Sequence, residues 1–292
     1  TTTLLLTLFV AITTAGFAQE YRSIDGSGNN PDNPDWGAAN SPLVNMTPVR
    51  FSDGISAPTG TNRPNPRMVS NRLFAQNDIL INDPTSMSDY TWVFGQFIDH
   101  DLSLVFDGNE PLMIDVPMGD RWFDPMSTGQ VVIPMRRSAV VEGTGIDEDN
   151  PRLFPNAITS FLDGSAVYGS EESHAEWLRT FYDGKLKTSS GNLLPFNTVD
   201  SEYDSEIDPN APHMEDAVGL SPKHFVAGDV RVNENPLLIS FHTLFVREHN
   251  RLCDELKEKH PDWTDEQLYQ YARKLVGRII QAIVYEEWLP SM

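Results

Sequence analysis

Residues 91–105 read Thr-Trp-Val-Phe-Gly-Gln-Phe-Ile-Asp-His-Asp-Leu-Ser-Leu-Val, and this is the most informative stretch of the sequence. On a helix, Gln96 and His100 lie four residues apart and share one face, while Asp99 and Asp101 flank the histidine. An amide, an imidazole and two carboxylates are costly to bury in an otherwise apolar helix, so the pattern favours a functional site. The alternative is a partly exposed helix end with a solvated Asp-His-Asp tail.

The composition indicates a globular protein with an acidic surface. The 292 residues suit one large or two ordinary domains, and 6 Trp, 15 Phe and 8 Tyr do not fit a disordered chain. The net charge of −21 disfavours nucleic acids and anionic membranes as partners and favours cations. Cys253, the single cysteine, excludes an intramolecular disulfide and any multi-cysteine metal site, and it is expected to be a small core or semi-exposed residue rather than a nucleophile.

The N-terminal residues 1–18 predict a signal peptide whose start is missing. The apolar run from Leu4 to about Ala15 is too short for a bilayer span, which needs roughly 20 residues. Gly16 and Ala18 follow at the spacing of a signal-peptidase site. Export without disulfides indicates a secreted, extracellular or periplasmic protein of bacterial origin. A buried N-terminal helix is the alternative.

The rest of the chain predicts a mainly helical body with long ordered loops. The periodicity predicts helices at about 88–101, 236–259 and 264–289, and irregular structure at 19–75, 107–157 (with short strands) and 197–222. Thr264 is the expected N-cap of the last helix. Apolar residues at helical spacing give the last two helices one face each: Leu237, Phe241, Leu244, Phe245 and Leu252, and Leu268, Tyr271, Leu275, Ile279 and Ile283. The chain then stops at Met292 without a tail, which predicts a C-terminally truncated fragment.

A second polar segment, Thr159-Ser-Phe-Leu-Asp-Gly-Ser165, places oxygen donors at every second residue. If the segment is extended, residues 159, 161, 163 and 165 project to one side. Hydroxyls, a carboxylate and the Phe161 main-chain carbonyl form the hard oxygen cage that Ca²⁺ prefers. The alternative is an ordinary polar turn in an acidic protein.

Two further features lie in the C-terminal third. Arg231 and Glu234 are three residues apart at an expected helix start, although Arg231 has the alternative of an exposed salt bridge to Asp229 or Glu234. His242 and His249 are seven apart and share a helical face. Satisfied structural histidines are a better interpretation of this pair than a two-histidine metal site, because that face offers no third carboxylate.

Several motifs together resemble one known family. Residues 92–101 closely resemble the distal-side helix of the animal-type heme peroxidases of the peroxidase–cyclooxygenase superfamily, including bacterial peroxidasin- and myeloperoxidase-like enzymes. The resemblance runs from Tyr21-Arg-Ser-Ile-Asp-Gly-Ser-Gly-Asn-Asn30 to Tyr285-Glu-Glu-Trp-Leu-Pro290. It implies that residues 19–292 are the N-terminal part of such a catalytic domain, with the mainly α heme-peroxidase fold truncated at its C-terminus.

The resemblance also assigns roles to the polar residues. His100 is the acid–base group and Arg231 assists heterolysis of the peroxide O–O bond, while Gln96 holds water or a halide. The implied cofactors are heme b, covalently linked through Asp99 and Glu234, and a calcium ion. The implied calcium ligands are Asp101, Thr159, Phe161, Asp163 and Ser165. Asn235 stands where the myeloperoxidase branch has a sulfonium-forming Met, which argues against chloride oxidation of the myeloperoxidase kind.

The expected function is a secreted heme peroxidase that takes part in the response to oxidative stress. It would use H₂O₂ to oxidise halides, thiocyanate or small phenolic donors. None of the seven histidines matches the family's proximal ligand, which follows the Tyr285 motif, so this chain alone is expected to be inactive. Two alternatives stay open: a heme fatty-acid dioxygenase of the same superfamily, and a non-catalytic calcium-dependent adhesion module of the peroxinectin kind.

Overall fold

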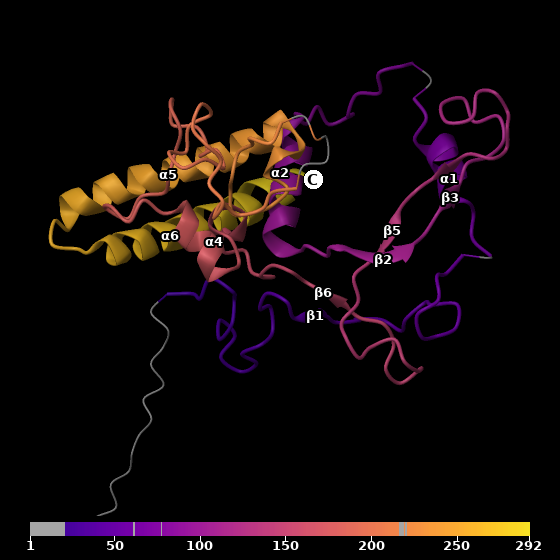
Figure 1. Cartoon of the computed structure of the whole chain (residues 1–292), viewed down its shortest axis with the longest axis horizontal. Coiled ribbons are helices and arrows are strands. Elements are labelled where there is room, and N and C mark those ends of the chain that lie inside the picture. Colours follow the sequence, from indigo (N-terminus) through magenta and orange to yellow (C-terminus); the bar gives the residue numbers. More distant parts are fainter. Residues whose placement is uncertain (1–20, 61, 77, 216–218, 220) are drawn as a thin grey trace, which may run out of the picture.

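A computed structural model describes residues 21–60, 62–76, 78–215, 219 and 221–292. The expected signal peptide over residues 1–18 lies outside the described residues. Figure 1 shows two long helices, α5 (Pro236–Lys259) and α6 (Asp265–Ala282), lying side by side, with α2 (Tyr90–Leu102) near one end of the pair. An arm of short hairpins extends away from this helical body (Figure 1).

The remaining elements are short. The other helices are α1 (Pro66–Leu73), α3 (Ser165–Tyr168), α4 (Glu172–Leu178), the 3₁₀ turn η1 (Val232–Glu234), the π-helical turn η2 (Ile283–Trp288) and α7 (Leu289–Ser291). The strands form three antiparallel pairs: β1 (Pro42–Leu43) with β6 (Phe154–Pro155), β2 (Asp107–Pro111) with β5 (Arg136–Ser138), and β3 (Ile114–Asp115) with β4 (Val132–Ile133). The prediction of a mainly helical chain with short strands in 107–157 is confirmed.

The three predicted helices are all present. The first begins and ends within two residues of the predicted 88–101, and α5 has the predicted bounds. The last runs as α6 and continues through η2, and Thr264 caps it with a reciprocal bond to Gln267, as its sequence predicts.

The prediction of irregular structure over 19–75 is wrong at α1. Its start follows from local chemistry, because the Asn65 side chain accepts a hydrogen bond from the Met68 amide and Pro66 occupies the first helical position. The helix is only 8 residues long and buries none of them, so its few apolar residues are too short a run for periodicity to detect.

The core lies between α2, α3, α5 and α6. Its largest fully buried side chains are Tyr168, Tyr269, Phe97, Leu194, Met214, Leu238, Leu268, Ile280, His242, His249, Val93 and Val167. Phe97 of α2 stacks on Phe245 of α5 with ring centroids 5.0 Å apart, and it makes a T-shaped contact with His242 at a centroid distance of 5.1 Å. The Phe97–Phe245 stack therefore joins α2, which carries His100, to the long helix α5.

The predicted apolar faces of α5 and α6 are offset from the buried ones. Leu244 is 54% exposed, and the buried residues of α6 include the small Ala272 and Gly277. A Cβ on Gly277 would lie 3.3 Å from the Asp163 carbonyl, so the backbones approach closely there. The spacing of large apolar residues does not predict such backbone contacts, because glycine and alanine form them.

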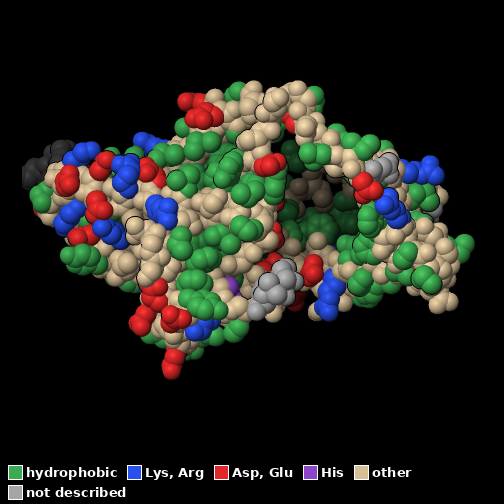
Figure 2. Space-filling view, turned by 90° about the horizontal axis from the view of Figure 1, so that it is seen from above, with side chains coloured by type: hydrophobic (Ala, Val, Ile, Leu, Met, Phe, Trp, Pro, Cys, Tyr) green, Lys and Arg blue, Asp and Glu red, His purple; other side chains and the backbone are tan. Residues whose placement is uncertain are grey.

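Figure 2 shows a hollow between the helical body and the hairpin arm, with hydrophobic side chains visible inside it. Among the described helices, none combines the length and the apolar character that crossing a membrane requires.

Candidate active site

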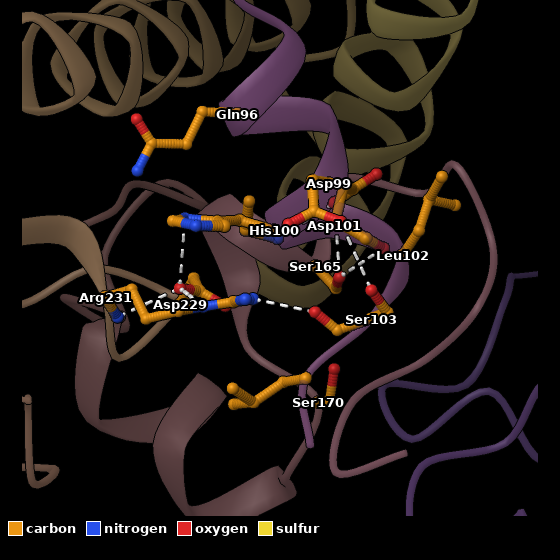
Figure 3. Close-up of polar contacts among 12 residues, drawn as sticks. Gln96, Asp99, His100, Asp101, Leu102, Ser103, Ser165, Ser170, Asp229 and Arg231 are labelled. Atoms are coloured by element: carbon orange, nitrogen blue, oxygen red, sulfur yellow. Dashed lines mark hydrogen bonds and ion pairs between the residues drawn. The ribbon is translucent and has the colours of Figure 1, made fainter. Parts of the chain in front are cut away.

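Helix α2 places His100 against a carboxylate from a distant segment. The imidazole is 4% exposed, and its Nδ1 lies 3.5 Å from Oδ1 of Asp229, which is 2% exposed (Figure 3). Burial lowers the pKa of His100, and the nearby Asp229 opposes that shift only in part. The imidazole is therefore neutral near pH 7 and able to accept a proton.

Arg231 binds both oxygens of the same Asp229 carboxylate. Its Nε donates to Asp229 Oδ1 at 2.9 Å and its Nη2 donates to Oδ2 at 2.8 Å, a bidentate pair. Nη2 also donates to the Ser103 carbonyl just beyond α2, at 3.0 Å. The salt bridge considered as the alternative for Arg231 is thus present, but it is largely buried and lies beside His100 rather than on an exposed turn.

Gln96 connects α2 to the start of α5. Its amide nitrogen donates to Glu234 Oε2 at 2.6 Å, and its oxygen accepts from Asn235 Nδ2 at 3.0 Å. Asn235 also caps α5, because its Oδ1 accepts the Leu238 amide at 2.8 Å. The oxygen and the nitrogen of the Gln96 amide are therefore both hydrogen-bonded to protein groups. Asn235 caps α5, a structural role that its position in place of a sulfonium-forming Met did not suggest.

The residues expected to hold heme lie at an open side of α2. Asp99 is exposed and accepts a 3.3 Å bond from Ser103 Oγ, and burial raises the pKa of the partly exposed Glu234. Trp92, one turn before Gln96, exposes 54% of its surface. The flat Trp92 ring, the Gln96 amide and the two accessible carboxylates fit the edge of a heme that is linked to the protein through carboxylates.

Asp101 points away from His100 and into the oxygen-rich loop. Its Oδ1 accepts from the Ser165 hydroxyl at 3.1 Å and from the Ala166 amide at 2.9 Å, and its Oδ2 accepts from the Gly164 amide at 3.2 Å. The Thr159 hydroxyl lies 3.2 Å from Asp163 Oδ1. The loop therefore joins α2 to α3, as the expected calcium site requires.

The predicted local geometry of this loop is wrong. Residues 161–163 form a bend rather than an extended segment, and Ser165 already opens α3 after Gly164 at φ +82°. The donors converge because the chain curls around them, and not because alternate residues of a strand share a side. The Phe161 carbonyl accepts the Asp163 amide at 2.9 Å within this curl.

The electrostatics of the loop fit a cation. Burial and the neighbouring Asp163 together raise the pKa of Asp101 to about 7. Burial also raises the pKa of Asp163, although Arg273 and Arg22 oppose it. Two adjacent buried carboxylates are costly without a positive partner. No cluster of three or more His, Cys, Asp or Glu occurs among the described residues, so this donor set depends on hydroxyls and a carbonyl.

The remaining candidates are structural or unassigned. His249 bonds Tyr168 Oη at 2.9 Å and the Gly184 carbonyl at 2.8 Å, which confirms it as a satisfied core histidine. Cys253 is fully buried, and burial raises the pKa of its thiol to about 12, so it is a core residue as predicted. His242 is fully buried too, and burial lowers its pKa to about 4 although a backbone contact with Ala166 opposes the shift; neither ring nitrogen has a partner at full hydrogen-bond geometry.

Sequence reasoning missed Asp229 as a site residue. Its only signal was its position two residues before Arg231, which also fits a surface ion pair. Its burial between Arg231 and His100 depends on packing of segments about 130 residues apart, which no local pattern reports.

The sequence of this chain matches a known protein family and several of its members. The family model described as "Animal haem peroxidase" matches residues 21–292. The chain belongs to the animal heme peroxidase family. It is 33% identical over 297 residues to peroxinectin A of Dictyostelium discoideum, covering 97% of this chain and 53% of that protein.

Solved structures agree with this placement. Peroxidase A from Dictyostelium discoideum superposes with a TM-score of 0.81 at 31% identity, covering 94% of this chain and 53% of that one. The Oryza sativa fatty acid alpha-dioxygenase gives 0.68 at 27% identity, covering 93% and 38%. The mainly α peroxidase fold is thereby confirmed, and the dioxygenase is the less similar of the two. The chain spans about half or less of the length of these relatives.

Proposed function

We propose that this chain forms the distal side of a heme peroxidase that uses H₂O₂ to oxidise halides, thiocyanate or small phenolic donors. The observation that carries the proposal is the burial of His100 beside the Asp229–Arg231 ion pair, on the helix that also presents Gln96 and Asp99. Heme, when bound, supplies the redox chemistry.

The protein's own groups manage the proton and the charge. The neutral His100 imidazole accepts a proton from one peroxide oxygen and returns it to the leaving oxygen. Arg231 stays protonated and stabilises negative charge that develops as the O–O bond lengthens. Among the described residues nothing bonds its Nη1, which leaves that nitrogen as the donor toward substrate, while Asp229 and Ser103 fix the rest of the guanidinium.

The test is peroxide-dependent oxidation of thiocyanate and a phenol by the heme-loaded protein expressed from its complete gene. We expect turnover with both peroxide and donor present and none when either is omitted. A heme-loaded protein that consumes no peroxide would contradict the proposal and favour the non-catalytic adhesion alternative. Consumption of a fatty acid and O₂ without peroxide would favour the dioxygenase.

A prediction on heme attachment separates these alternatives further. If Asp99 and Glu234 form ester links, acidic organic solvent should fail to extract the heme after turnover with peroxide. Replacing both residues (D99N together with E234Q) should release it, with a matched exposed-residue pair (D149N with E148Q) as the control. Full extraction from the unmodified protein would show that the ester links do not form.

A second prediction concerns calcium. If Asp101 and Asp163 are ligands, Ca²⁺ at 100 times its Kd should raise the free energy of unfolding by about 2.7 kcal/mol, as measured by urea titration against an EDTA-treated sample. D163N should abolish this gain, and in EDTA it should be no less stable than the unmodified protein, because it removes one of two adjacent buried carboxylates. The exposed Asp149 offers a control (D149N) that should keep the full response. Equal Ca²⁺ responses in D163N and the unmodified protein would exclude the site.

Export to the extracellular space or periplasm is also proposed, from the apolar N-terminal run and its small residues. Mass spectrometry of the mature N-terminus is the direct test, and cleavage after Ala18 is expected.

A further inference from the structure

Asp229 lies at the centre of the candidate site without an assigned role. Its carboxylate accepts three bonds from Arg231: Oδ1 from the amide and from Nε, both at 2.9 Å, and Oδ2 from Nη2 at 2.8 Å. Its own amide donates to the Ala166 carbonyl at 3.0 Å. A carboxylate held this way has little freedom to turn, and its Oδ1 is the atom nearest His100.

The backbone just before Asp229 is also constrained. Gly228 packs so closely on α3 that an added Cβ would lie 2.4 Å from both the Gly169 amide and the Ser165 carbonyl. No side chain fits there, so the loop is fixed against the same helix that contacts Asp101. The carboxylate is therefore positioned by backbone contacts that are independent of Arg231.

His100 Nδ1 is buried and makes no hydrogen bond, and it lies 3.5 Å from Asp229 Oδ1. A carboxylate only accepts, so a buried ring nitrogen beside it is favoured when it carries the proton. Catalytic hydrogen bonds are often long before substrate binds and shorten afterwards. With the proton on Nδ1, the neutral ring has its lone pair on Nε2.

The other groups around Asp229 are Arg231 and His242. Arg231 donates to both carboxylate oxygens, and Oδ1, which accepts its amide and Nε, is also the oxygen 3.5 Å from His100 Nδ1 (Figure 3). Burial lowers the pKa of His242 to about 4, although the nearby Asp229 opposes the shift, so the His242 imidazole is neutral. It forms no hydrogen bond to the Asp229 carboxylate.

We propose that Asp229 is a positioning residue that fixes the tautomer of His100, with the proton on Nδ1 and the lone pair on Nε2. Its importance for catalysis depends on the proposed peroxidase function, because only an unprotonated Nε2 accepts the peroxide proton. The residue acts through His100 and does not itself contact the reacting oxygens.

The test is ¹⁵N NMR of the seven imidazoles in histidine-labelled protein, recorded at about pH 8, above the ordinary imidazole range. The His100 signals are assigned by their loss in H100Q. His249 is the internal reference, because its Nε2 faces the Gly184 carbonyl and its Nδ1 faces the Tyr168 hydroxyl, which fixes the opposite tautomer. We expect Nδ1–H at His100 and Nε2–H at His249.

Two variants complete the test. D229A should convert a large part of His100 to the Nε2–H form with the His249 signals unchanged. D229N should keep Nδ1–H, because its amide oxygen can stay at the Oδ1 position, where it accepts three donors. Nε2–H at His100 in the unmodified protein, or an unchanged His100 in a folded D229A, would overturn the proposal. If D229A does not fold, the unmodified protein and D229N still decide it.

A kinetic measurement gives the second readout. In the heme-loaded protein, D229A should lower kcat/KM for peroxide by about 10²-fold and leave the KM for the electron donor unchanged. Absence of any peroxidase activity in the unmodified protein would contradict the proposed function while leaving the NMR result valid. Normal peroxide kinetics in a D229A protein that has changed tautomer would instead contradict the role of Asp229.

Discussion

H100A in the heme-loaded protein is expected to react with peroxide about 10²–10⁴-fold more slowly than the unmodified protein. The His100 imidazole is neutral near pH 7 and lies on the helix that presents Gln96 and Asp99, and alanine can neither accept the peroxide proton nor deliver it. Stopped-flow absorbance of the heme under excess peroxide measures the rate directly. Binding of heme should persist, because the predicted links involve Asp99 and Glu234.

The matched control for this prediction is H213A. His213 is exposed and lies outside the candidate site, so its loss should leave the rate unchanged. A rate for H100A within a few-fold of the unmodified protein would show that another group transfers the proton, and the assignment of α2 as the distal helix would then lose its chemical basis.

F97A is expected to lower the free energy of unfolding by about 3–5 kcal/mol. Phe97 is fully buried, stacks on Phe245 and contacts the edge of His242, so its removal leaves a cavity between α2 and α5. Urea titration followed by circular dichroism measures the change. Because this contact also sets the position of the helix that carries His100, the peroxide reaction of the surviving folded protein should slow as well.

The comparison variant is F74A, which removes the same side chain from a site where it is 74% exposed. Surface substitutions of this kind usually change stability by about 0.5 kcal/mol or less. If F97A and F74A destabilised the protein equally, the packing of α2 on α5 would not be a principal source of stability.

Local chemistry was sufficient to predict the helices. The N-cap Thr264 and the long periodic stretch of α5 depend on contacts within a few residues, and both were located correctly, whereas the reciprocal bond to Gln267 was not predicted. Helix α1 was missed because its start signal, Asn65 followed by Pro66, leads into a helix of only 8 residues that buries no side chain. The buried faces of α5 and α6 differ from the predicted apolar faces. In α6 the reason is that small residues such as Ala272 and Gly277 allow close backbone contact, which the spacing of large apolar residues does not predict.

The candidate site was predictable in its residue types but not in its connections. Gln96, His100 and Arg231 were identified by spacing and by resemblance to the family. Their partners were not: Asp229 was considered only as an exposed ion pair, and Asn235 only as a missing Met. Each of these contacts joins α2 to a segment about 130 residues away.

The sequence by itself determined the elements that form from neighbouring residues: the caps, the long helices, the acidic surface and the set of donors gathered around residues 99–101 and 159–165. Only the tertiary structure decided which of those donors face one another, how the 159–165 loop curls, and that one carboxylate lies between Arg231 and His100. The physical reason is that a hydrogen bond or ion pair between distant segments depends on the packing of whole helices, here the Phe97–Phe245 stack and the close approach at Gly228, and the residues that form the bond do not encode that packing.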